Sequence, residues 1–127
     1  MLRKAAYVAT LLALTVTPAL AAGDAANGEK VFRKCKACHV VDKEKNRVGP
    51  HLVGIFGRAA ASVEKFKYSK ALKAKADEGL VWDEASMAEF LKDPKKYAKG
   101  TKMGFVGLKK QDEIDNVIAY IKAESGK

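Results

Sequence analysis

The sequence predicts an all-α fold of short helices joined by long loops. Apolar residues recur at helical spacing in several segments, and no segment alternates polar and apolar residues over the length of a strand. At 127 residues without an internal repeat, the chain has room for one domain. A single small domain with this much loop needs a large apolar object at its centre to build an adequate core.

The first residues have the features of a secretory signal. Two basic residues precede an apolar stretch from Ala5 to Val16, and the triplet Ala19 to Ala21 has the small-residue pattern of a cleavage site. The apolar stretch is too short to span a bilayer, which disfavours an uncleaved anchor. We therefore expect residues 1–21 to be a cleaved signal peptide and residues 22–127 to form the domain.

The composition is that of a soluble, basic protein. Hydrophobic residues make up 48% of the chain and charged residues 31%, and no apolar run is long enough for a membrane span. Without Arg3 and Lys4 of the signal, the net charge falls from +9 to +7. An exported protein does not meet chromosomal DNA, so we expect acidic protein surfaces or anionic membranes, and not nucleic acid, as partners.

The first helix is expected to begin at Asp24, a good N-cap residue, and to run towards Cys35. Small and apolar residues share one of its faces: Ala25, Gly28, Val31 and Phe32. A glycine inside a helix weakens it, so Gly28 predicts the close approach of another backbone.

A long loop from Val40 to about Lys67 follows, with turn signals at Gly49, Gly54 and Gly57. A loop of this length inside a small domain is expected to wrap around something.

Two short helices are expected after the loop. Ser69 can cap a helix that continues through Ala76 and closes at Gly79. Asp83 can cap another helix, which has to stop before Pro94.

The last helix carries the clearest helical stripe, formed by Ile114, Val117, Ile118 and Ile121. Gly126 follows the stripe. We expect this helix to pack across the first one at Gly28.

The segment from Cys35 to His39 has the C-x-x-C-H spacing of haem attachment. On a helical turn both sulfurs face one side and can form thioethers with the haem vinyl groups, while the imidazole of His39 falls under the iron. A zinc site would have only His51 as a further Cys or His ligand, and a thioredoxin-like pair would need a βαβ context. A disulfide between Cys35 and Cys38 would leave the small core unexplained. We therefore predict one covalently bound haem c.

Met103 is the predicted second axial ligand of the iron. Met1 leaves with the signal, and Met87 lies in an expected helix, where methionine more often fills the core. Met103 lies in a glycine-flanked loop with no helical stripe to explain a buried thioether, and a Met/His ligand pair raises the reduction potential. His51 follows Gly-Pro in a polar loop, where an exposed or hydrogen-bonded role is more common than ligation.

Five separated stretches resemble class I cytochromes c, in order and over nearly all of the mature chain. They are residues 28–39, 49–58, 66–69, 93–97 and 100–103. The resemblance is to the short bacterial forms, of the cytochrome c2 kind, that are similar to the mitochondrial protein. It implies a single cytochrome c fold wrapped around one haem, with N- and C-terminal helices crossing.

The resemblance also implies roles for residues around the haem. The carbonyl of Pro50 would accept a hydrogen bond from His39, as second-shell partners of metal ligands do. Residues expected around the haem propionates are Arg58, Tyr68, Ser69 and Trp82, and Thr101 would supply a further hydroxyl to the pocket. Buried carboxylates need such cations and donors nearby, although Tyr68 and Trp82 also suit an ordinary core.

Two positions depart from the family pattern. Phe90 stands where many relatives have a tyrosine whose hydroxyl reaches the methionine sulfur, so this hydrogen bond is missing here. Lys99 stands where relatives often have proline, and its flexibility should loosen the loop that holds Met103.

The expected function is that of a soluble periplasmic carrier of single electrons. The alternative is a peroxidase-like haem enzyme or a ligand sensor with a labile methionine ligand. Filled iron positions argue against an enzyme. Basic residues predicted to dock partners are Arg33, Lys34, Lys36, Lys95, Lys96, Lys99 and Lys102, with Lys109 and Lys110 beyond them. For any one of these, simple exposure to solvent explains the charge equally well. As a group they predict docking on acidic surfaces of a quinol-oxidising complex, an oxidase, a reaction centre or a periplasmic dehydrogenase. We expect the protein to be a monomer.

Overall fold

A computed structural model describes residues 23–126 and bears out the all-α prediction. The predicted signal peptide lies outside the described residues. Within residues 23–126 the helices are α1 (Ala25–Phe32), α2 (Lys70–Asp77), α3 (Glu84–Lys92), α4 (Pro94–Tyr97) and α5 (Gln111–Ser125). In that range the structure has no strand, only an isolated bridge between Ala59 and Val81. None of the helices described is long and apolar enough to cross a membrane.

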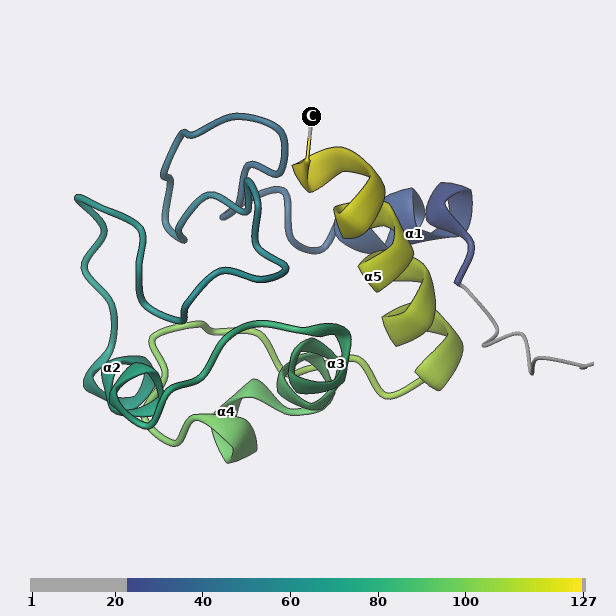
Figure 1. Cartoon of the computed structure of the whole chain (residues 1–127). Coiled ribbons are helices and arrows are strands. Elements are labelled where there is room, and N and C mark those ends of the chain that lie inside the picture. The colour runs from purple at the N-terminus through teal and green to yellow at the C-terminus, as the bar shows by residue number, and fades with distance from the viewer. Residues whose placement is uncertain (1–22, 127) are drawn as a thin grey trace, which may run out of the picture.

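Helices α1 and α5 cross and pack together, as predicted (Figure 1). Asp24 caps α1 by accepting a hydrogen bond from the amide of Ala26 at 2.8 Å. The crossing point is Gly28, where a Cβ atom would overlap the carbonyl group of Asn116 and lie 2.8 Å from Cβ of Tyr120. Asn116 also accepts a hydrogen bond from the backbone amide of Asp24 at 2.8 Å, so it ties the start of α1 to α5.

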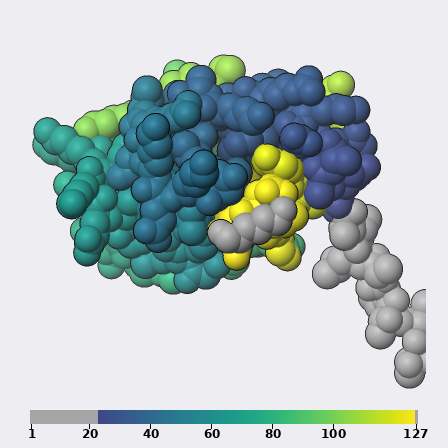
Figure 2. Space-filling view, turned by 90° about the horizontal axis from the view of Figure 1, so that it is seen from above, coloured from purple at the N-terminus to yellow at the C-terminus, as the bar shows by residue number. Residues whose placement is uncertain are grey.

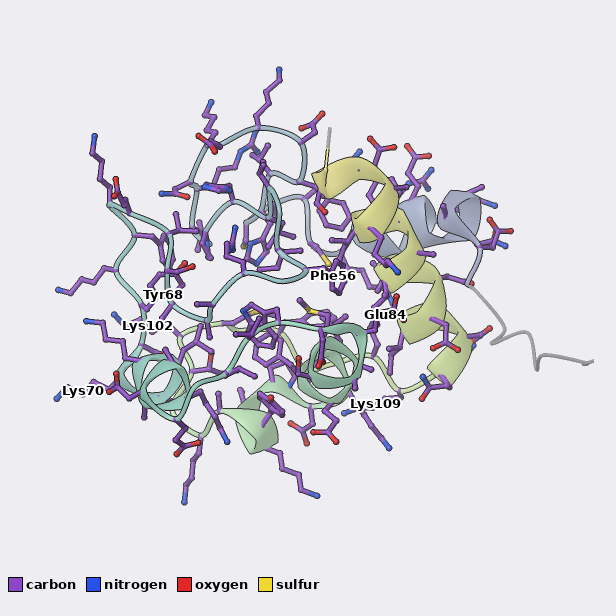
Figure 3. All side chains as sticks on the ribbon, viewed as in Figure 1. Phe56, Tyr68, Lys70, Glu84, Lys102 and Lys109 are labelled. Atoms are coloured by element: carbon purple, nitrogen blue, oxygen red, sulfur yellow. The ribbon has the colours of Figure 1, made fainter. Side chains whose placement is uncertain are left out.

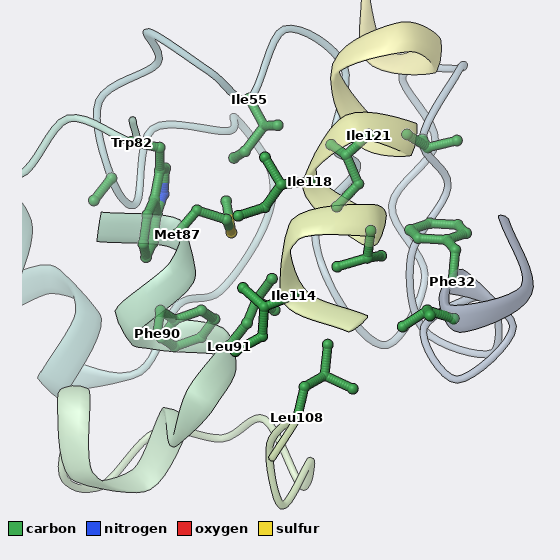
Figure 4. Packing of buried hydrophobic residues seen from close by; sticks show 14 residues of the cluster. Phe32, Ile55, Trp82, Met87, Phe90, Leu91, Leu108, Ile114, Ile118 and Ile121 are labelled. Atoms are coloured by element: carbon green, nitrogen blue, oxygen red, sulfur yellow. The ribbon is translucent and has the colours of Figure 1, made fainter. Parts of the chain in front are cut away.

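The hydrophobic core lies between α5, α1 and α3 (Figure 4). The predicted stripe of α5 faces inward, and Ile114 and Val117 are fully buried together with Phe32 of α1. Met87 of α3 is 6% exposed and belongs to this core, which confirms the prediction that it fills space there.

The other helices begin at the predicted caps. Ser69 accepts a hydrogen bond from the amide of Leu72 at the start of α2, and Asp83 accepts one from Ser86 at the start of α3. One helix was not predicted: Pro94 was read only as a stop, yet it also opens α4, with Asp93 as its N-cap. Proline suits the first position of a helix because the amide hydrogen it lacks has no helical partner there.

The long loop after His39 is anchored near its middle by two backbone hydrogen bonds. The amide of Gly54 donates to the carbonyl of Ser125 at 2.8 Å, and Figure 2 shows the C-terminal turn of α5 against this part of the chain. The amide of Gly57 donates to the carbonyl of Trp82 at 2.7 Å, next to α3. The loop therefore has a fixed position between α5 and the helices that follow it.

The crossing at Gly28 predicts the effect of a single added methyl group. Gly28→Ala should lower the free energy of unfolding by about 2 kcal/mol or more, since the backbones of α1 and α5 have to separate. Gly126→Ala is the matched control, because nothing lies within 4 Å of its Cβ position. Urea unfolding of both variants measures the difference, and equal stabilities would contradict the close approach at Gly28.

Candidate functional site

The predicted attachment motif lies on helical turns that continue from α1. The amides of Cys38 and His39 both donate to the carbonyl of Cys35, at 3.1 and 2.9 Å. The amide of Cys35 donates to the carbonyl of Phe32. This geometry keeps Cys35 and Cys38 close together and half-buried. The crossing of α1 with α5 thus fixes the position of the motif.

The imidazole of His39 is held by one strong hydrogen bond. Its Nδ1 lies 2.7 Å from the carbonyl oxygen of Pro50, as the resemblance implied. A carbonyl only accepts, so Nδ1 carries the hydrogen and Nε2 keeps its lone pair. Burial lowers the pKa of His39, although the bond to Pro50 works in the opposite direction. The result is a neutral imidazole, which is the form that binds a metal.

The two cysteines do not resemble a zinc or redox site. They form no disulfide in the structure, and burial raises the pKa of the Cys35 thiol to about 11. A thiol with this pKa is protonated at neutral pH, whereas zinc binding and thiol exchange use the thiolate. In the part of the chain that the structure describes, no group of three or more His, Cys, Asp or Glu side chains is placed to hold a metal ion.

Arg58 is a half-buried cation without a counter-anion among residues 23–126. Its Nη1 donates to the carbonyl of Val53 at 2.9 Å and its Nη2 to that of His51 at 3.1 Å. Its Nε is buried and has no hydrogen-bond partner among the described residues. Burial lowers the pKa of Arg58, and none of the ion pairs found in residues 23–126 includes it. A carboxylate of a bound molecule would satisfy both the charge and the free N–H.

Three hydroxyl groups of the predicted pocket accept hydrogen bonds from the backbone. Tyr68 accepts from the amide of Val63 at 3.1 Å, Ser69 from Leu72 at 3.1 Å, and Thr101 from Met103 at 3.3 Å. A hydroxyl that accepts can still donate its own hydrogen. Each of the three can therefore serve a carboxylate or another acceptor on a bound molecule.

Trp82 and Phe90 form an aromatic cluster with Tyr97. The ring centroids of Trp82 and Phe90 lie 5.2 Å apart, and those of Phe90 and Tyr97 lie 5.9 Å apart. Phe90 packs here as a buried aromatic residue and has no hydroxyl that could donate a hydrogen bond.

Met103 lies among apolar side chains that pack against the core but stay partly exposed. Besides Met103, the larger members of this set are Leu52, Phe56, Leu72, Leu80, Tyr97, Phe105 and Tyr120. In Figure 3, Phe56 lies where the loops after α1 face the half of the molecule built from α2, α3 and α4. This distribution matches a domain whose centre is completed by an apolar group.

His51, the weaker candidate for an iron ligand, has a local role. Its Nδ1 accepts a hydrogen bond from the amide of Val53 at 3.2 Å within the same loop. This agrees with the hydrogen-bonded loop position that sequence favoured for it.

The predicted docking residues are all exposed, but they differ in their surroundings. Lys34 forms an ion pair with Glu113 of α5 at 3.7 Å, which offsets part of its charge. Lys109 donates to the carbonyls of Lys92 and Val106. Lys102 and Lys109 lie at opposite ends of the segment that follows α4 (Figure 3).

Sequence reasoning missed two residues that support His39. A Cβ atom on Gly49 would lie 2.8 Å from Nδ1 and 2.9 Å from Nε2 of the imidazole, so Gly49 leaves the space that the ring occupies. Asn46 accepts a hydrogen bond from the amide of His51 at 3.0 Å. The sequence predicts the hydrogen bond to Pro50 through the family resemblance, but it marks Gly49 only as a turn signal, and nothing in the sequence around Asn46 indicates its contact.

Taken together, the residues fit a haem. Two thiols lie on consecutive helical turns beside a neutral imidazole, which suits covalent attachment and ligation of iron. The unpartnered Nε of Arg58 and the hydroxyls of Tyr68, Ser69 and Thr101 suit the propionate carboxylates.

Comparison with known proteins gives a consistent answer. The sequence profile of the family described as cytochrome c matches residues 25–125. The chain is 52% identical to cytochrome c2 of Afifella marina over 98 residues, which cover 76% of this chain and 79% of the relative. It is also 52% identical to cytochrome c-554 of Methylosinus trichosporium over 122 residues, which cover 95% and 89%.

A solved structure shares the fold. Cytochrome cH from Methylobacterium extorquens superposes with a TM-score of 0.72 at 47% identity, covering 80% of this chain and 99% of that one. With the spacing of Cys35 and Cys38, these matches identify the bound group as one covalently attached haem c.

The contact between Gly49 and His39 yields a test of the site. Gly49→Ala should displace the imidazole, lower the free energy of unfolding by about 1–3 kcal/mol and alter the haem absorption spectrum. Pro50→Ala is the matched neighbour: it keeps the accepting carbonyl, so its spectrum should be that of the wild type and its cost about 1 kcal/mol or less. If both variants have the same spectrum, the close fit of Gly49 to the ring is wrong.

Proposed function

The chain belongs to the cytochrome c family, and on that premise we propose that it is a soluble periplasmic carrier of single electrons, with His39 and Met103 as axial ligands of the haem iron. The observation that carries the proposal is the hydrogen bond between the imidazole of His39 and the carbonyl of Pro50. The imidazole Nδ1 is bound to the Pro50 carbonyl, which leaves Nε2 for the iron.

The chain's own residues hold the redox site in one geometry. Haem, when bound, supplies an iron that gains or loses one electron. The hydrogen bond to Pro50 fixes the rotation of the His39 ring, and Arg58 offers a half-buried positive charge with a buried, unpartnered Nε to the propionates. Side chains of α3 and α5 form a packed hydrophobic core, and this packing limits movement around the site.

A haem iron with two axial ligands from the protein is better suited to electron transfer than to catalysis. If His39 and Met103 fill both axial positions, no position remains for a substrate at the iron. We therefore propose that the protein is not an enzyme.

The proposed location follows from the expected signal peptide at residues 1–21, and the proposed partners follow from charge. The exposed basic residues around the attachment motif and the Met103 loop suit transient docking on acidic surfaces of redox complexes such as a quinol-oxidising complex or an oxidase.

Replacement of Met103 tests the ligand set. Met103→Ala should abolish the weak methionine-to-iron charge-transfer band of the ferric protein and lower the reduction potential, because a Met/His pair raises it. Met87→Leu is the control, since Met87 is buried in the core and a swap of similar volume costs less than about 1.5 kcal/mol.

Optical spectra and carbon monoxide binding to the reduced proteins measure the outcome. The wild type and Met87→Leu should show the band and bind no carbon monoxide, and Met103→Ala should bind it. A wild type that lacks the band and binds carbon monoxide would favour a haem enzyme or a ligand sensor.

Charge reversal tests the docking surface. With a quinol-oxidising complex as reductant, the bimolecular rate should fall steeply with added salt, and Lys102→Glu should lower it several-fold at low salt. Lys73→Glu makes the same charge change at an exposed position of α2 outside the predicted docking set. Stopped-flow rates that are equal for the two variants, or indifferent to salt, would remove the steering proposal.

A further inference from the structure

The peptide unit between Pro50 and His51 makes a hydrogen bond from each of its polar ends. Its carbonyl oxygen accepts from Nδ1 of His39 at 2.7 Å. Its N–H, the backbone amide of His51, donates to Oδ1 of Asn46 at 3.0 Å. A peptide unit is planar and rigid, so a group that holds its N–H also sets the direction of its carbonyl. Asn46 thus acts on the plane that orients His39.

Asn46 is itself held from a second loop. Its Nδ2 donates to the carbonyl of Glu64 at 3.4 Å, the longer and weaker of its two side-chain bonds. A backbone N–H can only donate and a carbonyl can only accept, so these two partners determine which way the amide of Asn46 faces. The side chain is half-buried and joins the segment before Gly49 to the segment before Phe66.

The contact is also electronic. Hydrogen bonds in series polarise one another, so an acceptor on the N–H of a peptide strengthens the carbonyl of the same peptide as an acceptor. The oxygen of Asn46 should therefore strengthen the bond from His39 to Pro50. A stronger bond makes the imidazole a more basic ligand, as second-shell partners do at other metal sites.

We propose that Asn46 is a positioning residue for His39, acting through the Pro50–His51 peptide unit. The proposal rests on the proposed role of His39 as an iron ligand and adds a residue outside the five stretches that carry the family resemblance. The side chain of His51 has no part in it, because its Nδ1 accepts from the amide of Val53.

The test compares three variants of the haem-loaded protein: Asn46→Ala, Asn46→Asp and His51→Ala. Asn46→Ala removes the acceptor, whereas Asn46→Asp keeps an oxygen there, gives it a negative charge and removes the donor to Glu64. His51→Ala keeps the peptide unit and removes only the side chain. The readout is the proton resonance of His39 Nδ1–H in the reduced, diamagnetic state and its rate of exchange with solvent.

The expected shifts have opposite signs. In Asn46→Ala the Nδ1–H resonance of His39 should move upfield, and the proton should exchange with solvent several-fold faster. The reduction potential should rise, because the imidazole becomes a less basic ligand. In Asn46→Asp the resonance should move downfield and the potential should fall, even though the bond to Glu64 is lost. His51→Ala should leave the resonance unchanged.

Two results would overturn the proposal. One is an unchanged His39 resonance in both Asn46 variants with a lower free energy of unfolding, which would make Asn46 a link between loops and nothing more. The other is a shift of the same sign in both. If Asn46→Ala does not fold, Asn46→Asp against the wild type decides by the sign of its shift. The two proposals fail in different measurements. A wild-type protein without the methionine-to-iron band contradicts the proposed function, whereas the Nδ1–H signal of His39 reports only the bond to Pro50 and tests the role of Asn46.

Discussion

The hydrogen bond from His39 to the Pro50 carbonyl is the contact on which the arrangement of the site depends. Its donor belongs to the turns that continue from α1, and α1 is fixed by its crossing with α5 at Gly28. Its acceptor belongs to the long loop, which is anchored to the end of α5 through Gly54. The bond therefore joins two segments that are each positioned by the same C-terminal helix.

This arrangement explains how a small domain with so much loop can have one defined structure. The core between α1, α3 and α5 is fully buried, but a further set of apolar side chains, Leu52, Phe56, Leu72 and Met103 among them, is only partly covered by protein. The half-buried charge of Arg58 likewise has no anionic partner among the described residues. A haem supplies apolar surface for the former and carboxylates for the latter, so binding and folding are expected to stabilise each other.

The features that could be predicted from sequence are those with a local cause. Asp24, Ser69 and Asp83 cap helices through bonds to residues close in sequence, and the stripe of α5 follows from helical periodicity. Helix α4 was missed because Pro94 was treated only as a terminator, although Asp93 before it is a good N-cap. The contacts of Gly49 and Asn46 depend on how distant segments meet, and neither periodicity nor a motif encodes that.

Phe90 has no hydroxyl, which bears on how the segment around Met103 is held. Phe90 is packed between Trp82 and Tyr97, so the position contributes rigidity through aromatic contact and offers no donor to a sulfur. The loop itself then has to position Met103, through the bond from its amide to Thr101 and the bond from the amide of Thr101 to Ala98. Lys99 lies inside this short turn and is exposed, without the restriction that a proline would impose. His39 is held by a chain of hydrogen bonds, whereas Met103, the proposed second ligand, is held by packing and one turn. The position of Met103 therefore depends more on the stability of its loop.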